Sequence, residues 1–312
     1  MATLQPDQHH DATPASAVGG LFLPIGRPRV MGIVNVTPDS FSDGGRYVEP
    51  DAAVAHGRRL LADGADVLDI GGESTRPGAT RPLVSEELDR VVPVIRELSR
   101  DGVVSVDTMR AEVAEAALEA GATIVNDVSG GLADPRILEV AAAAGAVYVA
   151  MHWRAHSTRM ADFATYDGPG GVVGTVAAEL SERLEAVLAA GVDPARVVLD
   201  PGLGFAKRGE HNWELLRDLD PITALGQPVL VGASRKSFLG RLLATDDGAP
   251  RPVEEREHAH IAVVAHLARE GVWGVRVHDV RATRDALAVV AALGSAAPGE
   301  QPSAAPVQEG RP

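Results

Sequence analysis

Short apolar runs alternate with longer amphipathic or alanine-rich stretches between residues 30 and 292. The apolar runs are rich in Val and Ile and lack strict two-residue alternation. This pattern is typical of parallel strands that are buried on both faces. We expect strands at residues 30–36, 67–71, 103–107, 123–127, 146–151, 197–200, 228–233 and 272–277.

The stretches between these runs have the length and spacing of helices. We expect helices at residues 51–63, 84–100, 110–120, 134–144, 172–190, 211–219, 254–270 and 281–292. Asp134 and Pro135 are typical of a helix start, as a capping side chain followed by proline. Strands and helices that alternate eight times predict the α/β class and a single (β/α)8 TIM barrel. A doubly wound open sheet is the alternative.

The two ends of the chain have a different composition from the middle. Residues 1–25 carry Asp, Gln, His and Pro, and residues 296–312 are rich in Pro, Ala, Gly and Ser. Such segments cannot bury a core, so we expect flexible tails at both ends. The barrel is therefore expected to form one domain over residues 26–295.

Composition and charge exclude several classes of function. A net charge of −14 argues against nonspecific nucleic-acid binding and against binding to anionic membranes. No apolar run approaches the ~18 residues of a membrane span, and no signal-peptide core is present. The chain has no cysteine, which excludes disulfides and thiolate catalysis. We expect a cytoplasmic protein.

Polar residues stand at the carboxyl end of every expected strand. In a (β/α)8 barrel these ends face one mouth, where the following loops build the active site. The clusters are Asn35 with the loop at 37–45, residues 72–78, Asp107 with Thr108, Asn126 with Asp127, His152, residues 200–202, residues 234–237 and residues 276–279. Loop solvation explains any one cluster more easily than all eight. Because Asp107 and Asn126 follow β-branched residues inside apolar runs, we expect both to be buried. Buried polar groups need partners, which a bound ligand rich in donors and acceptors would supply.

Seven motifs, in order, resemble the signature of the dihydropteroate synthases, which belong to the pterin-binding enzymes. They are "MGIVNVTPDSFSDGG", "DIGGESTRPGA", "SVDT", "IVNDVSGG", "LDPGLGF", "GASRKSFLG" and "GVRVHDV". The likeness runs from residue 29 to residue 293 without a large gap. The resemblance implies condensation of 6-hydroxymethyl-7,8-dihydropterin pyrophosphate with p-aminobenzoate, which gives 7,8-dihydropteroate and pyrophosphate in folate biosynthesis. It also implies Mg²⁺ as cofactor and often a homodimer.

The resemblance assigns roles to individual residues. The pterin ring would be bound by Asp107, Asn126, Met151, Asp200, Phe205 and Lys236. Pyrophosphate would be bound by Asn35, Arg276 and His278, with Asn35 also a ligand of Mg²⁺. The p-aminobenzoate site would use Phe41, Thr75, Arg76, Pro77 and Ser237. The catalytic residues would be Asp107, Asp200, Lys236, Arg276 and His278.

These residue types suit the implied chemistry. The planar fork of Arg276 matches phosphate oxygens, and Mg²⁺ prefers hard oxygen ligands such as the amide of Asn35. A buried Asp200 needs compensation from ring N–H groups and Lys236, and would favour positive charge on the ring. The simpler alternative for Asp200 is a structural role in a turn at Asp-Pro-Gly. The simpler alternative for His278 is that of an isolated polar residue in a loop. Closure of the long first loop over the bound intermediate would explain its length.

Two other functions are compatible with the barrel. A catalytically silent paralogue that binds pterin should carry damaged motifs in the first two loops or at Arg276 and His278, and these are intact. A methyltetrahydrofolate-dependent methyltransferase domain would lack "TPDSFSDGG" and "STRPG" and would need a corrinoid partner. We also expect a sulfonamide target, with susceptibility set by small differences around Phe41, Thr75, Pro77 and Ser237.

Overall fold

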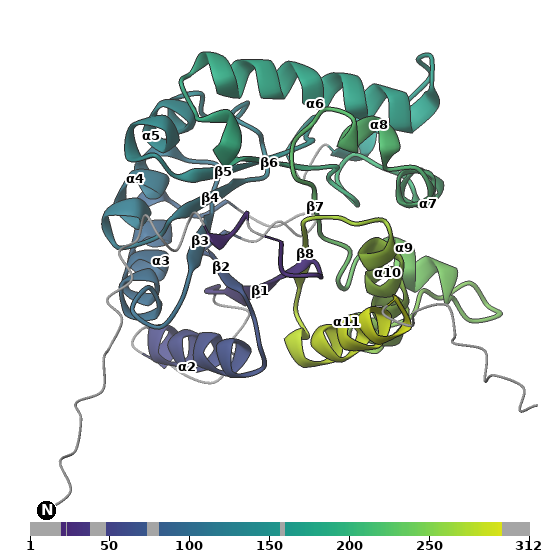
Figure 1. Ribbon diagram of the computed structural model, residues 1–312, viewed down its shortest axis with the longest axis horizontal. Coiled ribbons are helices and arrows are strands. Elements are labelled where there is room, and N and C mark those ends of the chain that lie inside the picture. Colours follow the sequence, from purple (N-terminus) through teal and green to yellow (C-terminus); the bar gives the residue numbers. More distant parts are fainter. Residues whose placement is uncertain (1–19, 23, 38–47, 74–80, 157–159, 295–312) are drawn as a thin grey trace, which may run out of the picture.

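Eight parallel strands follow one another around an almost closed barrel in the computed structural model (Figure 1). The structure describes residues 20–22, 24–37, 48–73, 81–156 and 160–294. The strands are β1 (Arg29–Asn35), β2 (Val67–Gly71), β3 (Val104–Asp107), β4 (Ile124–Asp127), β5 (Val147–Met151), β6 (Val197–Asp200), β7 (Leu230–Val231) and β8 (Gly274–Val277). Strand β1 pairs with both β2 and β8. A bridge between Leu199 and Val229 joins β6 to the segment that leads into β7. The predicted barrel is confirmed, and the open-sheet alternative is wrong.

Helices surround this barrel on the outside (Figure 1). They are α2 (Val48–Ala62), α3 (Val84–Leu98), α4 (Ala111–Glu119), α5 (Arg136–Ala144), α6 (Gly171–Ala189), α7 (Gly209–Arg217), α8 (Asp220–Thr223), α9 (Ser237–Leu242), α10 (Glu257–Arg269) and α11 (Val280–Gly294). Short 3-10 helices span Met160–Phe163, Pro194–Arg196 and Val253–Glu255. The expected helix at 254–270 therefore begins later, at Glu257, and the short helices α8 and α9 had not been predicted.

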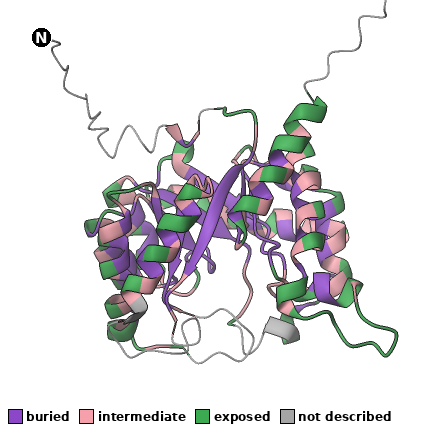
Figure 2. Ribbon diagram, turned by 90° about the horizontal axis from the view of Figure 1, so that it is seen from below, coloured by how far each residue is buried: buried purple, intermediate pink, exposed green. Residues whose placement is uncertain are grey.

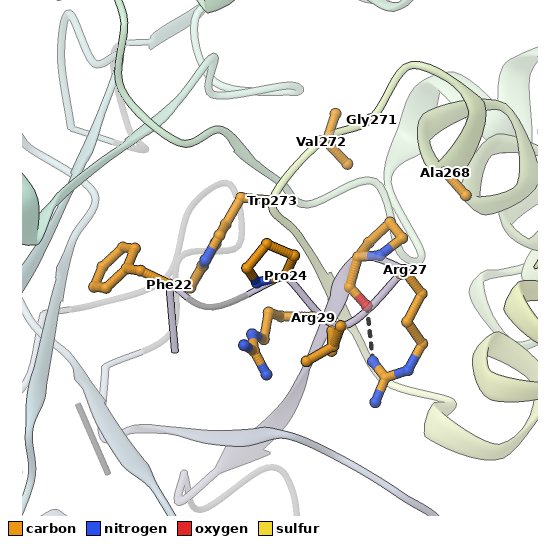
Figure 3. A pocket seen from close by; sticks show the side chains of 11 residues that line it. Phe22, Pro24, Arg27, Arg29, Ala268, Gly271, Val272 and Trp273 are labelled. Atoms are coloured by element: carbon orange, nitrogen blue, oxygen red, sulfur yellow. Dashed lines mark hydrogen bonds between the residues drawn. The ribbon is translucent and has the colours of Figure 1, made fainter. Parts of the chain in front are cut away.

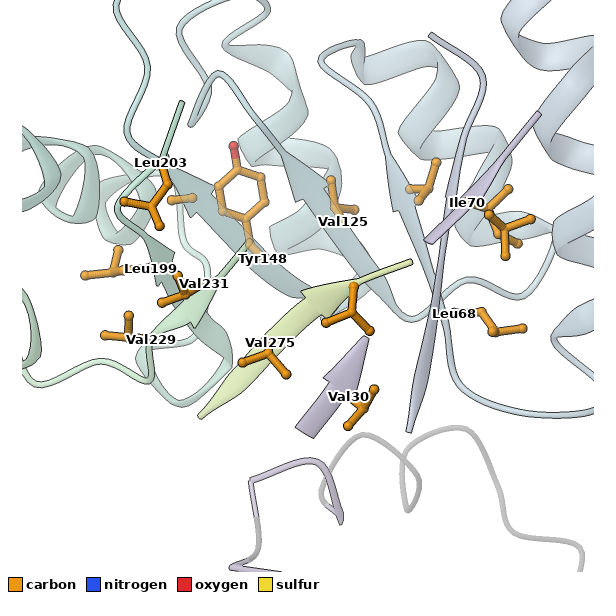
Figure 4. Packing of buried hydrophobic residues seen from close by; sticks show 14 of the residues in the cluster. Val30, Leu68, Ile70, Val125, Tyr148, Leu199, Leu203, Val229, Val231 and Val275 are labelled. Carbon is orange, nitrogen blue, oxygen red and sulfur yellow. The ribbon is translucent and has the colours of Figure 1, made fainter. Parts of the chain in front are cut away.

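The outer face of the barrel carries the main hydrophobic core. Val30, Leu68, Ile70, Val125 and Val275 belong to one cluster that the strands share with the surrounding helices (Figure 4). Since neighbouring residues of a strand point to opposite faces, every second residue faces this core. The helices bury their inner sides and expose their outer sides, while the strands are buried throughout much of their length (Figure 2).

The inner face of the barrel is divided into two layers. Near the amino ends of the strands it is apolar, and the buried members of this cluster are Leu21, Met31, Val67, Ile124, Val147, Val149, Val198 and Leu230. Towards the carboxyl ends, the same alternation places polar residues inside, including Asn35, Asp69, Asp107, Asn126, Asp200 and Arg276. The apolar layer near the amino ends is thus a packed plug. The polar layer near the carboxyl ends is available for chemistry.

The amino end of the barrel is closed by residues that were expected to belong to the tail. Leu21 is only 3% exposed, and its carbonyl oxygen accepts hydrogen bonds from Arg29 Nε at 2.9 Å and Trp273 Nε1 at 3.0 Å. Phe22 stacks on Trp273, with ring centroids 5.9 Å apart. Leu21 and Phe22 therefore pack against the barrel, although they lie within residues 1–25, which were expected to form a flexible tail.

A groove of about 310 Å³ lies beside this closure. Phe22, Pro24, Arg27, Arg29 and Trp273 are among its lining residues (Figure 3). It lies at the end of the barrel opposite to the polar layer.

Among the helices that the structure describes, none combines the length and the apolar character needed to cross a bilayer.

We expect Leu21→Ala to reduce the free energy of unfolding by about 2–4 kcal/mol, because it leaves a cavity under the barrel. Ile25→Ala is the matched control, since Ile25 is 41% exposed and an exposed substitution should change stability by less than about 0.5 kcal/mol. Chemical denaturation of both variants measures the difference. Equal stability of the two variants would show that Leu21 does not belong to the folded domain.

Candidate active site

A buried cluster of charges occupies the polar layer inside the barrel. Arg276 Nε donates to Asp69 Oδ2 at 2.6 Å, and Arg276 Nη2 donates to Asp107 Oδ2 at 2.7 Å. Asn126 Nδ2 donates to the same Asp69 oxygen at 2.9 Å. Asp69 is fully buried. These bonds join β2, β3, β4 and β8 across the mouth of the barrel.

The strand register explains why these residues meet. Asn35 pairs with Gly71, Gly71 with Asp107, and Asp107 with Asn126, so the four residues form one rung across β1 to β4. Gly71 contributes no side chain to this rung, and a Cβ atom there would lie 3.3 Å from the Cβ atom of Asp107. The glycine therefore leaves space between Asn35 and Asp107. With the residues that the structure describes, the Asn35 side chain forms no hydrogen bond.

A second polar group comes from the segments that follow β6 and β7. Asp200 Oδ1 accepts a hydrogen bond from the backbone N–H of Gly202 at 2.7 Å, so Asp200 also supports the Asp-Pro-Gly turn. Gly202 has a φ of +67°, and a Cβ atom there would lie 2.3 Å from the carbonyl oxygen of His152. Only glycine fits this turn. Lys236 Nζ donates to the carbonyl oxygen of Leu203.

The two polar groups also interact electrostatically. Burial raises the pKa of Asp200, while Lys236 and Arg276 act to lower it. Burial lowers the pKa of Lys236 to about 8, with Asp200 opposing and Arg276 adding to this shift. Burial also raises the pKa of Asp107 to about 7, against the effect of Arg276. The carboxylates and cations thus influence one another across the mouth.

An apolar wall stands next to these charges. Met109, Val128 and Met151 form a small cluster, and Phe205 packs against it. The Phe205 ring lies under Lys236 Nζ, 4.9 Å from ring centroid to nitrogen. Cation–π contacts of this kind favour a charged ammonium. The structure therefore brings Met151 and Phe205 beside the polar groups, as expected for the walls of a flat ring pocket.

The remaining expected residues are distributed around this mouth. His278 follows β8, and its Nδ1 lies 2.9 Å from Ser234 Oγ in the loop after β7. Ser237 is exposed at the first position of α9. Asn126 is 4% exposed, so its expected burial is confirmed, while the Asp107 side chain is 11% exposed. The expected residues Phe41, Thr75, Arg76 and Pro77 lie outside the described residues.

Sequence reasoning missed a second hydrogen-bonded network behind the pocket. Lys207 Nζ donates to the carbonyl oxygen of Phe205 at 3.1 Å and lies 2.8 Å from His152 Nδ1. His152 Nε2 lies 2.8 Å from Glu179 Oε2, and Arg154 forms an ion pair with Glu179. Burial, together with Lys207, lowers the pKa of His152 to about 4. The imidazole is therefore neutral near pH 7, accepts from Lys207 and donates to Glu179.

Asp69 was also missed as a site residue, although it stands inside the quoted motif "DIGGESTRPGA". The sequence offered one signal, which is a carboxylate in the middle of the apolar run "VLDIG". Because a buried charge needs a partner, this carboxylate could have been predicted to face a buried cation.

Comparisons with known proteins agree with this geometry. The model of the pterin binding enzyme family matches residues 31–278. The dihydropteroate synthase of Mycobacterium leprae is 55% identical over 273 residues, which cover 86% of this chain and 95% of that protein. The structure of Xanthomonas albilineans dihydropteroate synthase with 4-aminobenzoic acid has a TM-score of 0.80 at 46% identity, covering 89% of this chain and 97% of that one. A structure of the same enzyme with 7,8-dihydropteroate has a TM-score of 0.76 at 43% identity and covers 89% and 98% of the two chains.

The chain therefore belongs to the family of pterin-binding enzymes. Its activity is that of a dihydropteroate synthase, a transferase of folate biosynthesis, as the sequence motifs predicted. The silent paralogue and the methyltransferase domain are not favoured.

We expect pterin binding to strengthen as the pH rises through about 7, where Asp107 loses its proton, and to weaken above about 8, where Lys236 becomes neutral. An ionised Asp107 can accept a ring N–H, and a charged Lys236 balances Asp200. Calorimetric titration with the pterin substrate between about pH 6 and pH 9 measures both limbs. Asp107→Asn should remove the lower limb, and Lys236→Arg should remove the upper one. A flat profile for the unmodified protein would contradict the assignment.

We expect Asp69→Asn to lower kcat/KM for the pterin pyrophosphate by about a hundredfold, because Arg276 and Asn126 lose the carboxylate that positions them. Ser105→Ala is the matched control. Ser105 is opposite Asp69 in the register and fully buried, and its hydroxyl has no partner among the described residues. Steady-state kinetics of both variants decide the point. Similar kinetics for the two would mean that Asp69 only fills space.

Proposed function

We propose that the polar mouth of the barrel holds the pterin pyrophosphate against p-aminobenzoate, with a division of roles among its residues. Asp107, Asn126, Asp200 and Lys236 hydrogen-bond the amino-pyrimidine part of the ring, and Met151 with Phe205 contacts its faces. Arg276 and His278 bind the pyrophosphate. The convergence of Asp69, Asp107 and Arg276 inside one barrel mouth is the observation that carries this proposal.

The arrangement of charges suits a substitution through a cation-like transition state. The bond between the pterin methylene carbon and the pyrophosphate oxygen breaks, and pyrophosphate leaves with the bonding electron pair. The amine nitrogen of p-aminobenzoate forms the new bond to that carbon and then loses a proton. Carboxylates at Asp107 and Asp200 would stabilise positive charge on the ring, while Arg276 would stabilise the departing anion. No protein nucleophile takes part.

Mg²⁺ belongs to this proposal as a cofactor that the substrate helps to bind. Among the described residues, no group of three His, Asp or Glu side chains could hold a metal ion. The amide oxygen of Asn35 fits as a single hard ligand, since Mg²⁺ keeps several waters and commonly uses substrate phosphates. The ion would neutralise charge on the pyrophosphate when bound.

A site for the second substrate, p-aminobenzoate, completes the division of roles. Its contacts would be Phe41, Thr75, Arg76, Pro77 and Ser237. Support comes from relatives, because the Xanthomonas albilineans enzyme binds 4-aminobenzoic acid and a Yersinia pestis dihydropteroate synthase, 40% identical, binds a sulfonamide drug. We therefore also propose that this protein is a sulfonamide target. We also propose a homodimer, because of the family resemblance. We propose a cytoplasmic location, which suits a chain without cysteine.

Release of pyrophosphate tests this proposal most simply. With pterin pyrophosphate, Mg²⁺ and p-aminobenzoate present, we expect steady release, and little release without the amine. Chelation of Mg²⁺ should abolish turnover, and renewed Mg²⁺ should restore it. Lys236→Ala and Asp107→Ala should weaken pterin binding, while Phe41→Ala and Thr75→Ala should mainly raise KM for p-aminobenzoate. Equal losses for both substrates in all four variants would contradict the division of roles.

A further inference from the structure

Arg256 is a buried arginine that has no carboxylate partner among the described residues. It stands directly before α10 and is 9% exposed. Its Nε donates to the carbonyl oxygen of Arg251 at 2.9 Å, and its Nη1 donates to the carbonyl oxygen of Arg235 at 2.8 Å. Burying a guanidinium is costly unless its donors are satisfied. The hydrogen-bond partners of this buried cation are therefore backbone carbonyls of loops.

The carbonyl of Arg235 belongs to an unusual stretch of backbone. Arg235 has a φ of +62°, in the left-handed region that residues with a side chain rarely adopt. Lys236 follows at once and is the capping residue of α9. The peptide between the two is held at both ends, since its oxygen accepts from Arg256 and its N–H donates to Ala233 at 3.2 Å. The direction in which Lys236 leaves the backbone depends on this peptide.

A third segment packs against the same guanidinium. A Cβ atom at Gly240 would lie 2.5 Å from Arg256 Nε and 2.7 Å from its Cζ, so the group lies close against the backbone of α9. Arg251 N also donates to the carbonyl oxygen of Gly240 at 2.9 Å. Arg256 thus ties together the loop after β7, the helix α9 and the segment that precedes α10.

We propose that Arg256 is a positioning residue for Lys236. By holding the strained Arg235 peptide, Arg256 keeps the Lys236 ammonium over the Phe205 ring and against the Leu203 carbonyl, where it would meet the pterin. This inference rests on the proposed role of Lys236 in binding the pterin. It adds a residue that touches neither substrate nor reacting atoms, yet sets the geometry of one that does.

The test uses substitutions that separate positioning from stability. Arg256→Met keeps an apolar stem but loses both donors, and Arg256→Lys keeps the charge but lacks the fork that reaches two carbonyls at once. We expect Arg256→Met to weaken pterin pyrophosphate binding by about tenfold to a hundredfold, as expected for a misplaced binding group. Arg256→Lys should restore binding only in part. Arg251→Met is the matched control, because Arg251 is exposed and accepts the hydrogen bond of Arg256 with its backbone carbonyl, which the substitution keeps.

A double variant supplies the decisive readout. Arg235→Gly removes the cost of the left-handed conformation, so the peptide needs less support. We expect Arg235→Gly to recover part of the pterin affinity lost in Arg256→Met, as measured by a double-mutant cycle with calorimetry. Circular dichroism confirms that each variant is folded at the temperature of the titration. A role limited to stability would lower the melting temperature without this rescue.

Lys236→Ala, measured in parallel, separates the two proposals. If Lys236→Ala leaves pterin affinity unchanged, the proposed role of Lys236 fails. If Lys236→Ala loses affinity but Arg256→Met binds as the unmodified protein does, the positioning role of Arg256 is overturned while the site assignment stands. Loss in both variants, with rescue by Arg235→Gly, supports both.

Discussion

The guanidinium of Arg276 lies between the carboxylates of Asp69 and Asp107, and much of the site depends on this buried ion cluster. A charge inside a protein is tolerated only when partners satisfy it, and removing one partner leaves the others exposed to the full cost of burial. The cluster takes its members from β2, β3 and β8, and Asn126 adds β4. It can therefore form only when β8 returns to the start of the sheet. Closure of the barrel and assembly of the pocket depend on the same interaction.

The interior of the barrel separates stability from chemistry along the strand direction. The layer near the amino ends of the strands, which includes Met31, Val67 and Ile124, is a packed apolar plug, and Leu21 and Trp273 close its amino end. Above it, the same inward-facing positions carry Asp69, Asp107 and Arg276 instead. Since alternation along a strand has a period of two, two residues are enough to pass from plug to pocket. The packed plug gives the charged layer a rigid base, which keeps its side chains in place for a flat ligand.

Much of this organisation could be predicted from the sequence, because it depends on patterns that are local. The Val-rich runs predicted eight strands, and their polar ends predicted one mouth. Asp69 was missed because a single carboxylate inside "VLDIG" looks like part of a buried strand until β8 brings Arg276 beside it, 207 residues away. Leu21 was assigned to the tail since its partner Trp273 is 252 residues distant. The seventh strand is shorter than expected, at Leu230–Val231, because the pairing of β7 with β8 covers only these two residues.

A crystal structure with 7,8-dihydropteroate bound would test the central claim most directly. The account predicts that the pterin ring lies inside the barrel mouth, within hydrogen-bond distance of Asp107, Asn126, Asp200 and Lys236, while Arg276 keeps its bond to Asp69. A product molecule bound elsewhere on the protein, or bound in the mouth without contact to these four side chains, would contradict it.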